Sequence, residues 1–434
     1  MKPTSAATFT ALQLLGFTSA LLKPDSVSRT IVWSLSDIQP SPSFNWTPCW
    51  ANFTCALLQV PLDYADPSAG TTNVPFIRTS SSNASAQDVL FNPGGPGASG
   101  FDFVLGLDEK QRQELLGPQW NLVGFDPRGV KSSDINLDCF PGNREDDALF
   151  QSELGGHLSD YTSLLSLHEA WELGRGLGER FVDGDDYYAG GSRTSQMDAN
   201  EAASTFFTYC FEAGPDRCAF YGNASGPDKI EQRFSELLTE LREHPIVVSD
   251  PELTQRPTLI GWKDLRSLFM SVLYDALGGF PDFAATLVEL EQHDATSFFK
   301  STRSAGVERP LNDTIRFYDG GQTYIQIMCA DTNGRFNVST FEQYVALDNY
   351  LRQQSFYGGD GNAIIYAICR GLDIKPPRSQ VLNGTVSANQ TSSPILFMSS
   401  TLDPVTPLRS AKTVSSRFGG SALLTVERTG VRYS

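Results

Sequence analysis

A rigid loop rich in glycine and proline constrains this chain more than any other stretch. Residues 92–100 read Asn-Pro-Gly-Gly-Pro-Gly-Ala-Ser-Gly, directly after the short apolar run Asp88–Phe91. Such a run is typical of the end of a buried parallel strand. Glycines let the backbone of a turn approach a ligand closely, and backbone N–H groups presented this way can hold a developing oxyanion. The alternative is a tight strand-to-helix turn without chemistry.

Hydrophobic periodicity predicts an α/β fold, in which a mostly parallel central sheet has helices on both faces. We expect helices and strands to alternate through the first part of the chain. The expected strands lie at 73–78, 88–91, 120–125, 394–398 and 422–426, and the helices of the first part at 109–116 and 161–181. Between 198 and 375 apolar residues recur at helical spacing, over 198–211, 229–242, 262–277 and 281–291. This helical block is interpreted as a cap over the sheet edge where ligands bind.

The charge balance limits the partners of the chain. Its 434 residues carry a formal net charge of −17. Nucleic acids and anionic membranes both attract basic surfaces, so we expect neither as a partner. The oligomeric state is left open by the sequence.

The N-terminus and the sequons predict a secreted glycoprotein. Lys2 precedes a mostly apolar run from 6 to 22, which we interpret as a signal peptide at 1–22, with a soluble helix as the alternative. No other run approaches the ~20 apolar residues of a membrane helix. Eight N-x-S/T sequons are predicted glycosylation sites, at Asn45, Asn52, Asn83, Asn223, Asn312, Asn337, Asn383 and Asn389.

Seven cysteines are consistent with secretion, because none has zinc-finger or redox-motif spacing. The natural reading is a disulfide framework, whose connectivity the sequence does not prove. We expect loops closed by Cys49 with Cys55, Cys210 with Cys218, and Cys329 with Cys369. Cys139 is then the unpaired thiol.

Several separated motifs resemble one enzyme family. They are NPGGPGASG from 92, NLVGFDPRG from 121, Cys-Phe at 139–140, AGPDRCAF from 213 and PILFMSSTLDPVTPLRSA from 394. In this order they resemble the secreted tripeptidyl-aminopeptidase-like branch of the α/β-hydrolases, which is related to the proline iminopeptidases. The resemblance runs from about residue 44 onward. It implies an α/β-hydrolase core at 40–190 and 391–434, with a helical cap at 191–390.

The resemblance implies a serine hydrolase that cleaves an amide or ester through an acyl-enzyme. The catalytic triad of this class follows the chain order Ser, Asp, His. Asp403 matches the triad acid, with a helix-capping Asp as the alternative. Gly94, Gly95 and Gly97 match the oxyanion loop. Asp126 and Arg128 match a motif that positions this loop, although Lys131 replaces the second glycine of the family pattern.

The nucleophile is missing from the expected pattern. A nucleophile elbow needs G-x-S-x-G between an apolar strand and a helix, and no such pentapeptide occurs in these 434 residues. The nearest string surrounds Ser192, which lacks a preceding apolar strand; a polar loop is the alternative role. By the family pattern, Phe181 joins Val182 across a gap that would hold the central elbow strand.

The triad base is missing as well. The four histidines, His157, His168, His244 and His293, all precede Asp403. The family pattern continues Gly-His after the last strand, whereas this chain reads Gly430-Val431. No histidine spacing suggests a metal site.

Three interpretations remain. The first is a serine hydrolase by descent that is inactive as this chain is written. A skipped exon at 181–182 and a frameshifted terminus would explain the missing elbow and the missing histidine. The natural gene product would then be active. The second is a non-catalytic binding protein that keeps the loop and cap as a pocket. The third is an active enzyme that uses Ser192. The expected ligand is a small ester or peptide, and no cofactor is implied, because nucleophilic acyl transfer needs none.

Overall fold

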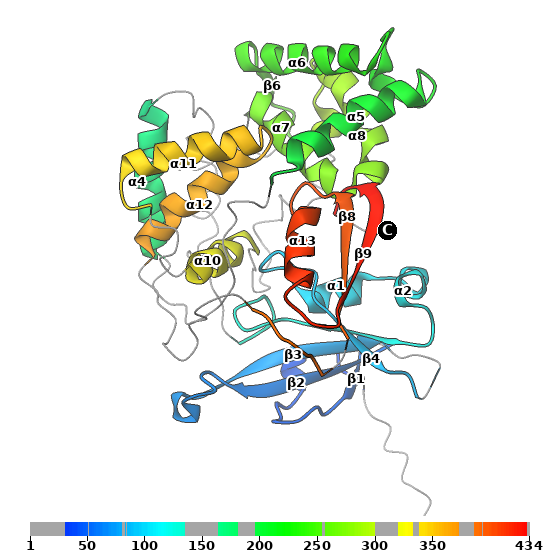
Figure 1. The fold of residues 1–434 in the computed structure, drawn as a ribbon, viewed down its shortest axis with the longest axis vertical. Helices are drawn as coiled ribbons and strands as arrows, with labels where there is room; N and C mark the ends of the chain where they lie inside the picture. Colours follow the sequence, from blue (N-terminus) through cyan, green and yellow to red (C-terminus); the bar gives the residue numbers. More distant parts are fainter. Residues whose placement is uncertain are drawn as a thin grey trace, which may run out of the picture.

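Figure 1 shows the computed structural model of the chain, with a β-rich part, a β8–β9 pair and two groups of helices. The structure describes residues 31–50, 52–79, 83, 85–134, 164–180, 196–253, 257–299, 320–332, 338–372, 386–392 and 394–431. Several predictions fall outside these ranges: the signal peptide at 1–22, Cys139, the 181–182 junction, Ser192, and the sequons at Asn312, Asn337 and Asn383.

The largest sheet has five strands in the order β1-β2-β3-β5-β4. Neighbours are antiparallel except β4 and β5, which are parallel. The expectation of a mostly parallel sheet is therefore wrong for this part. β2 and β3 form a long antiparallel pair, and β3 also pairs antiparallel with β5. The strands span Thr47–Cys49 (β1), Phe53–Pro61 (β2), Thr71–Thr79 (β3), Asp88–Phe91 (β4) and Asn121–Phe125 (β5).

Two smaller sheets complete the strands that the structure describes. β8 (Leu396–Leu402) pairs parallel with β9 (Ala422–Thr429), and β6 (Ile246–Val248) pairs antiparallel with β7 (Thr258–Ile260). Within the described ranges, β4 and β8 belong to different sheets. Both carry exposed apolar side chains, with Leu90 60% and Leu396 59% exposed.

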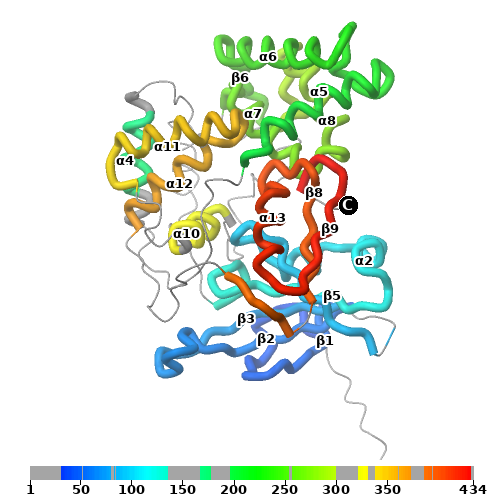
Figure 2. Tube along the Cα trace, in the orientation of Figure 1, coloured from blue at the N-terminus to red at the C-terminus, as the bar shows by residue number. Residues whose placement is uncertain are grey.

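Most of the described helices form two groups, which lie apart in the tube of Figure 2. Each group has its own buried core. One group surrounds Phe206, Phe234, Phe269 and Phe283 and contains α5 (Ala199–Ala213), α6 (Pro227–Glu243), α7 (Trp262–Val272) and α8 (Ala276–Glu291). The other contains α4 (Leu164–Arg180), α11 (Phe341–Gln354) and α12 (Gly359–Gly371), with α10 (Gly320–Thr332) against α12. α4 lies inside the predicted core segment 40–190, yet it packs against α11 and α12.

One helix boundary differs from the sequence pattern. We expected a helix to run through 262–277 and the next to begin at Pro281. Instead α7 ends at Val272, and α8 begins at Ala276, with Pro281 inside it. Ala276 and Phe280 are both buried in the helical core, so packing outweighs the local cost of a proline within the helix.

The three expected disulfides are present in the structure. Cys49–Cys55 closes the turn between β1 and β2, Cys210–Cys218 ties the end of α5 to the loop after it, and Cys329–Cys369 joins α10 to α12. The described sequon asparagines Asn45, Asn52, Asn83, Asn223 and Asn389 are all exposed. Across the described residues, no helix has both the length and the apolar character needed to cross a membrane.

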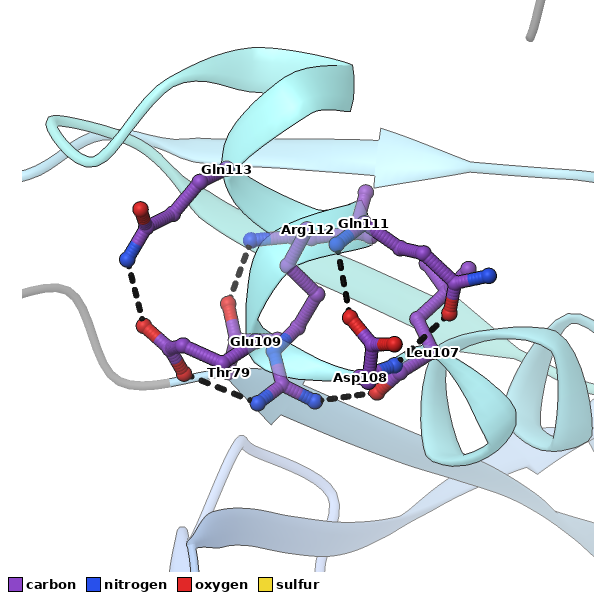
Figure 3. A network of polar contacts seen from close by, with 8 residues as sticks. Thr79, Leu107, Asp108, Glu109, Gln111, Arg112 and Gln113 are labelled. Carbon is purple, nitrogen blue, oxygen red and sulfur yellow. Dashed lines mark hydrogen bonds and ion pairs between the residues drawn. The ribbon is translucent and has the colours of Figure 1, made fainter.

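Local polar contacts set the start of α2 (Glu109–Leu116), as Figure 3 shows. Asp108 and Gln111 form a reciprocal capping box, in which the Asp108 carboxylate accepts from the Gln111 N–H at 2.8 Å. Glu109 accepts hydrogen bonds from Arg112 and Gln113, each at 2.9 Å. These contacts explain why the sequence alone located this helix correctly.

Two glycines allow the helix after the glycine-rich loop to touch the sheet. α1 (Gly100–Gly106) begins against β5, and a Cβ atom placed on Gly124 would lie 2.1 Å from the carbonyl oxygen of Gly100. A Cβ on Gly100 would lie 2.5 Å from the carbonyl oxygen of Phe125. Because backbone lies on both sides of the contact, neither position has room for a side chain.

We predict that Gly124→Ala destabilises the chain by at least about 2 kcal/mol, because α1 must move away from β5. Urea unfolding measures this loss as a lower midpoint. Gly106→Ala is the matched control: no atom lies within 4 Å of its added Cβ, and in a helix it should be neutral or stabilising by up to about 1 kcal/mol. Equal midpoints for the two variants would contradict the close contact.

Candidate active site

The glycine-rich loop folds back on itself after β4. Gly94, Gly95 and Gly97 have φ angles of +82°, +115° and +90°, which residues with side chains rarely adopt. The N–H of Gly94 donates to Asn92 Oδ1 at 2.8 Å, and the N–H of Ala98 donates to the Gly94 carbonyl at 3.3 Å. The three glycines are therefore required by the shape of the loop, and two of its amide donors are used within it.

A buried carboxylate fixes the end of this loop. Asp126 follows β5 and is fully buried. One of its oxygens accepts from Ser99 Oγ at 2.6 Å and from the Phe101 N–H at 3.1 Å, and the other accepts from the Ser132 N–H at 3.1 Å. Burial raises the pKa of Asp126, and these hydrogen bonds oppose that rise. Asp126 thus connects the loop, the start of α1 and the turn after β5.

Arg128 holds a different part of the same region. Its guanidinium donates to the carbonyl oxygens of Leu62 at 2.7 Å and Pro61 at 3.3 Å, at the end of β2. The sequence motif paired Arg128 with Asp126, and the structure brings both into the turn that follows β5. Ser99 and Ser132 were not identified from sequence, since a serine in a loop or turn carries no distinctive signal.

Asp403 lies directly after β8 and is 1% exposed. Its Oδ1 accepts from the N–H groups of Val405 at 2.9 Å and Thr406 at 2.7 Å, and its Oδ2 accepts from Thr406 Oγ1 at 2.7 Å. These bonds shape the turn that leads into α13 (Leu408–Ser415). The N-cap of α13 is Pro407, without a side-chain cap hydrogen bond, so Asp403 shapes the turn before the helix and does not cap the helix itself.

The end of β9 lies beside Asp403. The N–H of Gly430 donates to the Leu402 carbonyl at 2.9 Å, and the N–H of Val431 donates to the Tyr274 carbonyl at 3.0 Å. Position 431 therefore follows the strand next to Asp403, and it is the position at which the sequence pattern led us to expect a histidine. Valine occupies it and has no group that can accept a proton.

Charged and phenolic groups from distant parts of the chain surround Asp403. Burial, above all, raises its pKa, and the carboxylate of Asp198 raises it further. Burial and the nearby charge of Asp403 likewise raise the pKa of Tyr274. Asp198 forms an ion pair with Arg409 of α13. Sequence reasoning missed Tyr274, Asp198 and Arg409, because they are brought together only by the packing of the helices against β8.

The other residues of the predicted site are not assembled around Asp403. Ser192 and His157 lie outside the described residues. The remaining histidines are exposed: His168 contacts the Phe341 ring, His244 lies 3.3 Å from Glu240, and His293 follows the end of α8. In the described part of the chain, no group of three or more His, Cys, Asp or Glu side chains could hold a metal ion.

We predict a pH-dependent stability that depends on Asp403. Because the pKa of Asp403 is raised on folding, the stability it contributes is fully present below the ordinary value of 3.8 and is lost as pH rises through the folded-state pKa. Asp403→Asn cannot titrate at this position. The melting temperature of the wild type should therefore rise relative to that of Asp403→Asn as pH falls from about 7 to 4.

Asp216→Asn, at an exposed position, is the control and should follow the wild type at every pH. Scanning fluorimetry over this range measures all three proteins. Parallel curves for the wild type and Asp403→Asn would contradict the raised pKa.

Parts of the chain are similar to known proteins. Residues 355–434 match the family described as TAP-like protein. Serine protease Hip1 of Mycobacterium tuberculosis is 35% identical over 103 residues, 22% of this chain and 20% of that protein. Carboxylesterase B of Mycobacterium tuberculosis is 34% identical over 108 residues, 25% of this chain and 20% of the relative. Tripeptidyl aminopeptidase of Streptomyces lividans is 30% identical over 99 residues, 20% of this chain and 18% of the relative.

These matches are partial, and the chain spans about a fifth of the length of the relatives it matches. The segment that matches the TAP-like family contains β8, Asp403, α13 and β9. It does not contain the glycine-rich loop, whose assignment still depends on its own geometry. Together, the family match and the three relatives support an α/β-hydrolase family for this chain.

Proposed function

We propose that this protein is a secreted serine hydrolase by descent, of the type that cleaves peptide or ester bonds, and that the chain in this form does not catalyse the reaction. The observation that carries the proposal is the site after β8. Asp403, the proposed triad acid, is buried directly after β8, and the strand end beside it carries Val431 where the proposed base would be expected.

The chemistry of the class explains why this combination is inactive. A serine attacks the carbonyl carbon, a histidine accepts its proton, and a buried aspartate orients that histidine. Loss of the serine or the histidine costs about six orders of magnitude in turnover in well-studied triads. Without an imidazole, Asp403 has no base to orient. Any remaining rate acceleration would then come from substrate binding and the oxyanion loop.

The substrate class follows from the relatives. One is a serine protease, one a carboxylesterase and one a tripeptidyl aminopeptidase. The ancestral substrate is therefore proposed to be a peptide N-terminus or a small ester, selected by the helical cap. Three disulfides and five exposed sequons support an extracellular location, because both features belong to the secretory route.

A non-catalytic binding protein is the second candidate. The hydrogen bonds that Asp126 accepts keep the glycine-rich loop in a defined shape, and this shape does not need a nucleophile. Such a protein would still hold an ester or peptide beside the loop. Its ligands would raise the melting temperature of the intact chain.

We predict that a fluorophosphonate probe leaves the folded wild-type chain unlabelled. An active serine hydrolase treated in parallel controls for the reagent, and Ser192→Ala tests the remaining nucleophile candidate. Labelling of the wild type that disappears in Ser192→Ala would overturn the proposed inactivity and identify Ser192 as the nucleophile. Labelling that persists in Ser192→Ala would overturn it and exclude Ser192.

The acid position can be tested without activity. In Val431→His, we expect the introduced imidazole to have a pKa above its ordinary value of about 6.5, because the Asp403 carboxylate favours the imidazolium. Adding Asp403→Asn should lower that pKa again. NMR titration of the histidine ring protons measures both proteins. The same pKa with and without the Asp403 carboxylate would contradict the assignment of Asp403 as the acid.

A further inference from the structure

A cavity of about 630 Å³ lies in the helical block, away from the residues of the candidate active site. It is walled by α5, α6, α7 and the connection from α11 to α12. None of its lining residues belongs to the glycine-rich loop or to the group around Asp403. Its volume lies within the range of about 300–1,000 Å³ that is usual for small-molecule sites.

Three arginines from three different helices line this cavity, in a chain whose net charge is −17. Arg266 of α7 is 4% exposed, and its guanidinium donates to the Phe356 carbonyl and lies 4.9 Å from the centre of the Trp262 ring. Arg242 of α6 lies 5.2 Å from the same ring. The third arginine, Arg352, lies in the last turn of α11. The indole of Trp262 thus stands beside two guanidinium groups.

The summed charge of the lining residues favours a ligand that carries a single negative charge. Arg352 donates to the buried carboxylate of Asp348 at 2.6 Å, so its charge is offset within the protein. Glu231 is the single carboxylate among the residues that line the cavity, so the formal charges of the three arginines, Asp348 and Glu231 sum to +1. The net charge at the cavity is therefore about +1 by this accounting. A phosphate monoester, which carries about −1.5 to −2 charges at neutral pH, would be repelled by Glu231.

The rest of the wall is aromatic. The rings of Phe207 and Phe234 lie 5.6 Å apart, and Tyr357 packs edge-on against Phe356 at 5.1 Å. Burial raises the pKa of Tyr357, so its phenol stays protonated at neutral pH and can donate a hydrogen bond. Flat apolar surface next to guanidinium forks suits a ring that bears a carboxylate.

We propose that this cavity binds a small aromatic monocarboxylate, with its carboxylate held by Arg242 and Arg266 and its ring against Trp262 and the neighbouring aromatic side chains. The carboxylate accepts hydrogen bonds from the two guanidinium groups, while the ring replaces water on the apolar wall. This inference does not depend on the proposed hydrolase ancestry, because it uses none of the same residues.

Calorimetric titration of the intact chain with 2-naphthoate tests the proposal, and 2-naphthamide serves as the uncharged ligand of the same shape. We expect the amide to bind at least about tenfold more weakly than the carboxylate. Arg242→Gln should weaken 2-naphthoate about three- to tenfold and leave the amide unchanged, because it removes one charged donor at the exposed rim. Arg417→Gln, at an exposed position outside the cavity, makes the same change in net charge and should alter neither ligand.

Glu231→Gln provides a test in the opposite direction. It removes the repelling carboxylate, so it should tighten 2-naphthoate severalfold and should favour 2-naphthyl phosphate even more. A cooperative thermal melt of each variant establishes that it is folded before titration. The proposal is overturned if the folded wild type binds neither ligand, if carboxylate and amide bind equally, or if Arg242→Gln behaves like Arg417→Gln.

Discussion

The carboxylate of Asp126 links the glycine-rich loop and the start of α1 to the turn after β5. It accepts hydrogen bonds from the end of the glycine-rich loop, the start of α1 and the turn after β5. Hydrogen bonds to a charged group contribute about 1.5–3 kcal/mol each, and here they must also offset complete burial. The close approach of Gly100 to Gly124 provides the steric half of the same arrangement. Together they hold the loop against the parallel pair β4–β5.

The second carboxylate, Asp403, shows how structural and catalytic geometry coincide. Its three hydrogen bonds build the turn before α13, and they would also hold its oxygens in place to orient a neighbouring imidazole. The turn before α13 therefore depends on this carboxylate whether or not it orients a base. Under the proposed descent, this dependence would explain why Asp403 is kept beside Val431.

The helical block contains the arginine-lined cavity, which is separate from the residues around Asp403. Its two buried cores meet near the connection of α11 to α12, where Tyr357 packs on Phe269 of one core and α12 belongs to the other. The arginine-lined cavity lies at this junction. The two cores are built from separate sets of helices. The guanidinium groups and aromatic rings that line the cavity between them offer a ligand-binding surface that neither core provides alone.

The sequence by itself determined the local elements and the small-loop disulfides. The strand 88–91, the helix 109–116 and the Cys49–Cys55 loop depend on neighbours in the chain, so hydrophobic patterning and short cysteine spacing were enough to predict them. Only the tertiary structure decided the antiparallel pairing of β2, β3 and β5, the start of α8 before Pro281, and the meeting of Tyr274, Asp198 and Arg409 near Asp403. These features arise from contacts between residues far apart in the chain, whose energies have no signature in any single stretch of sequence.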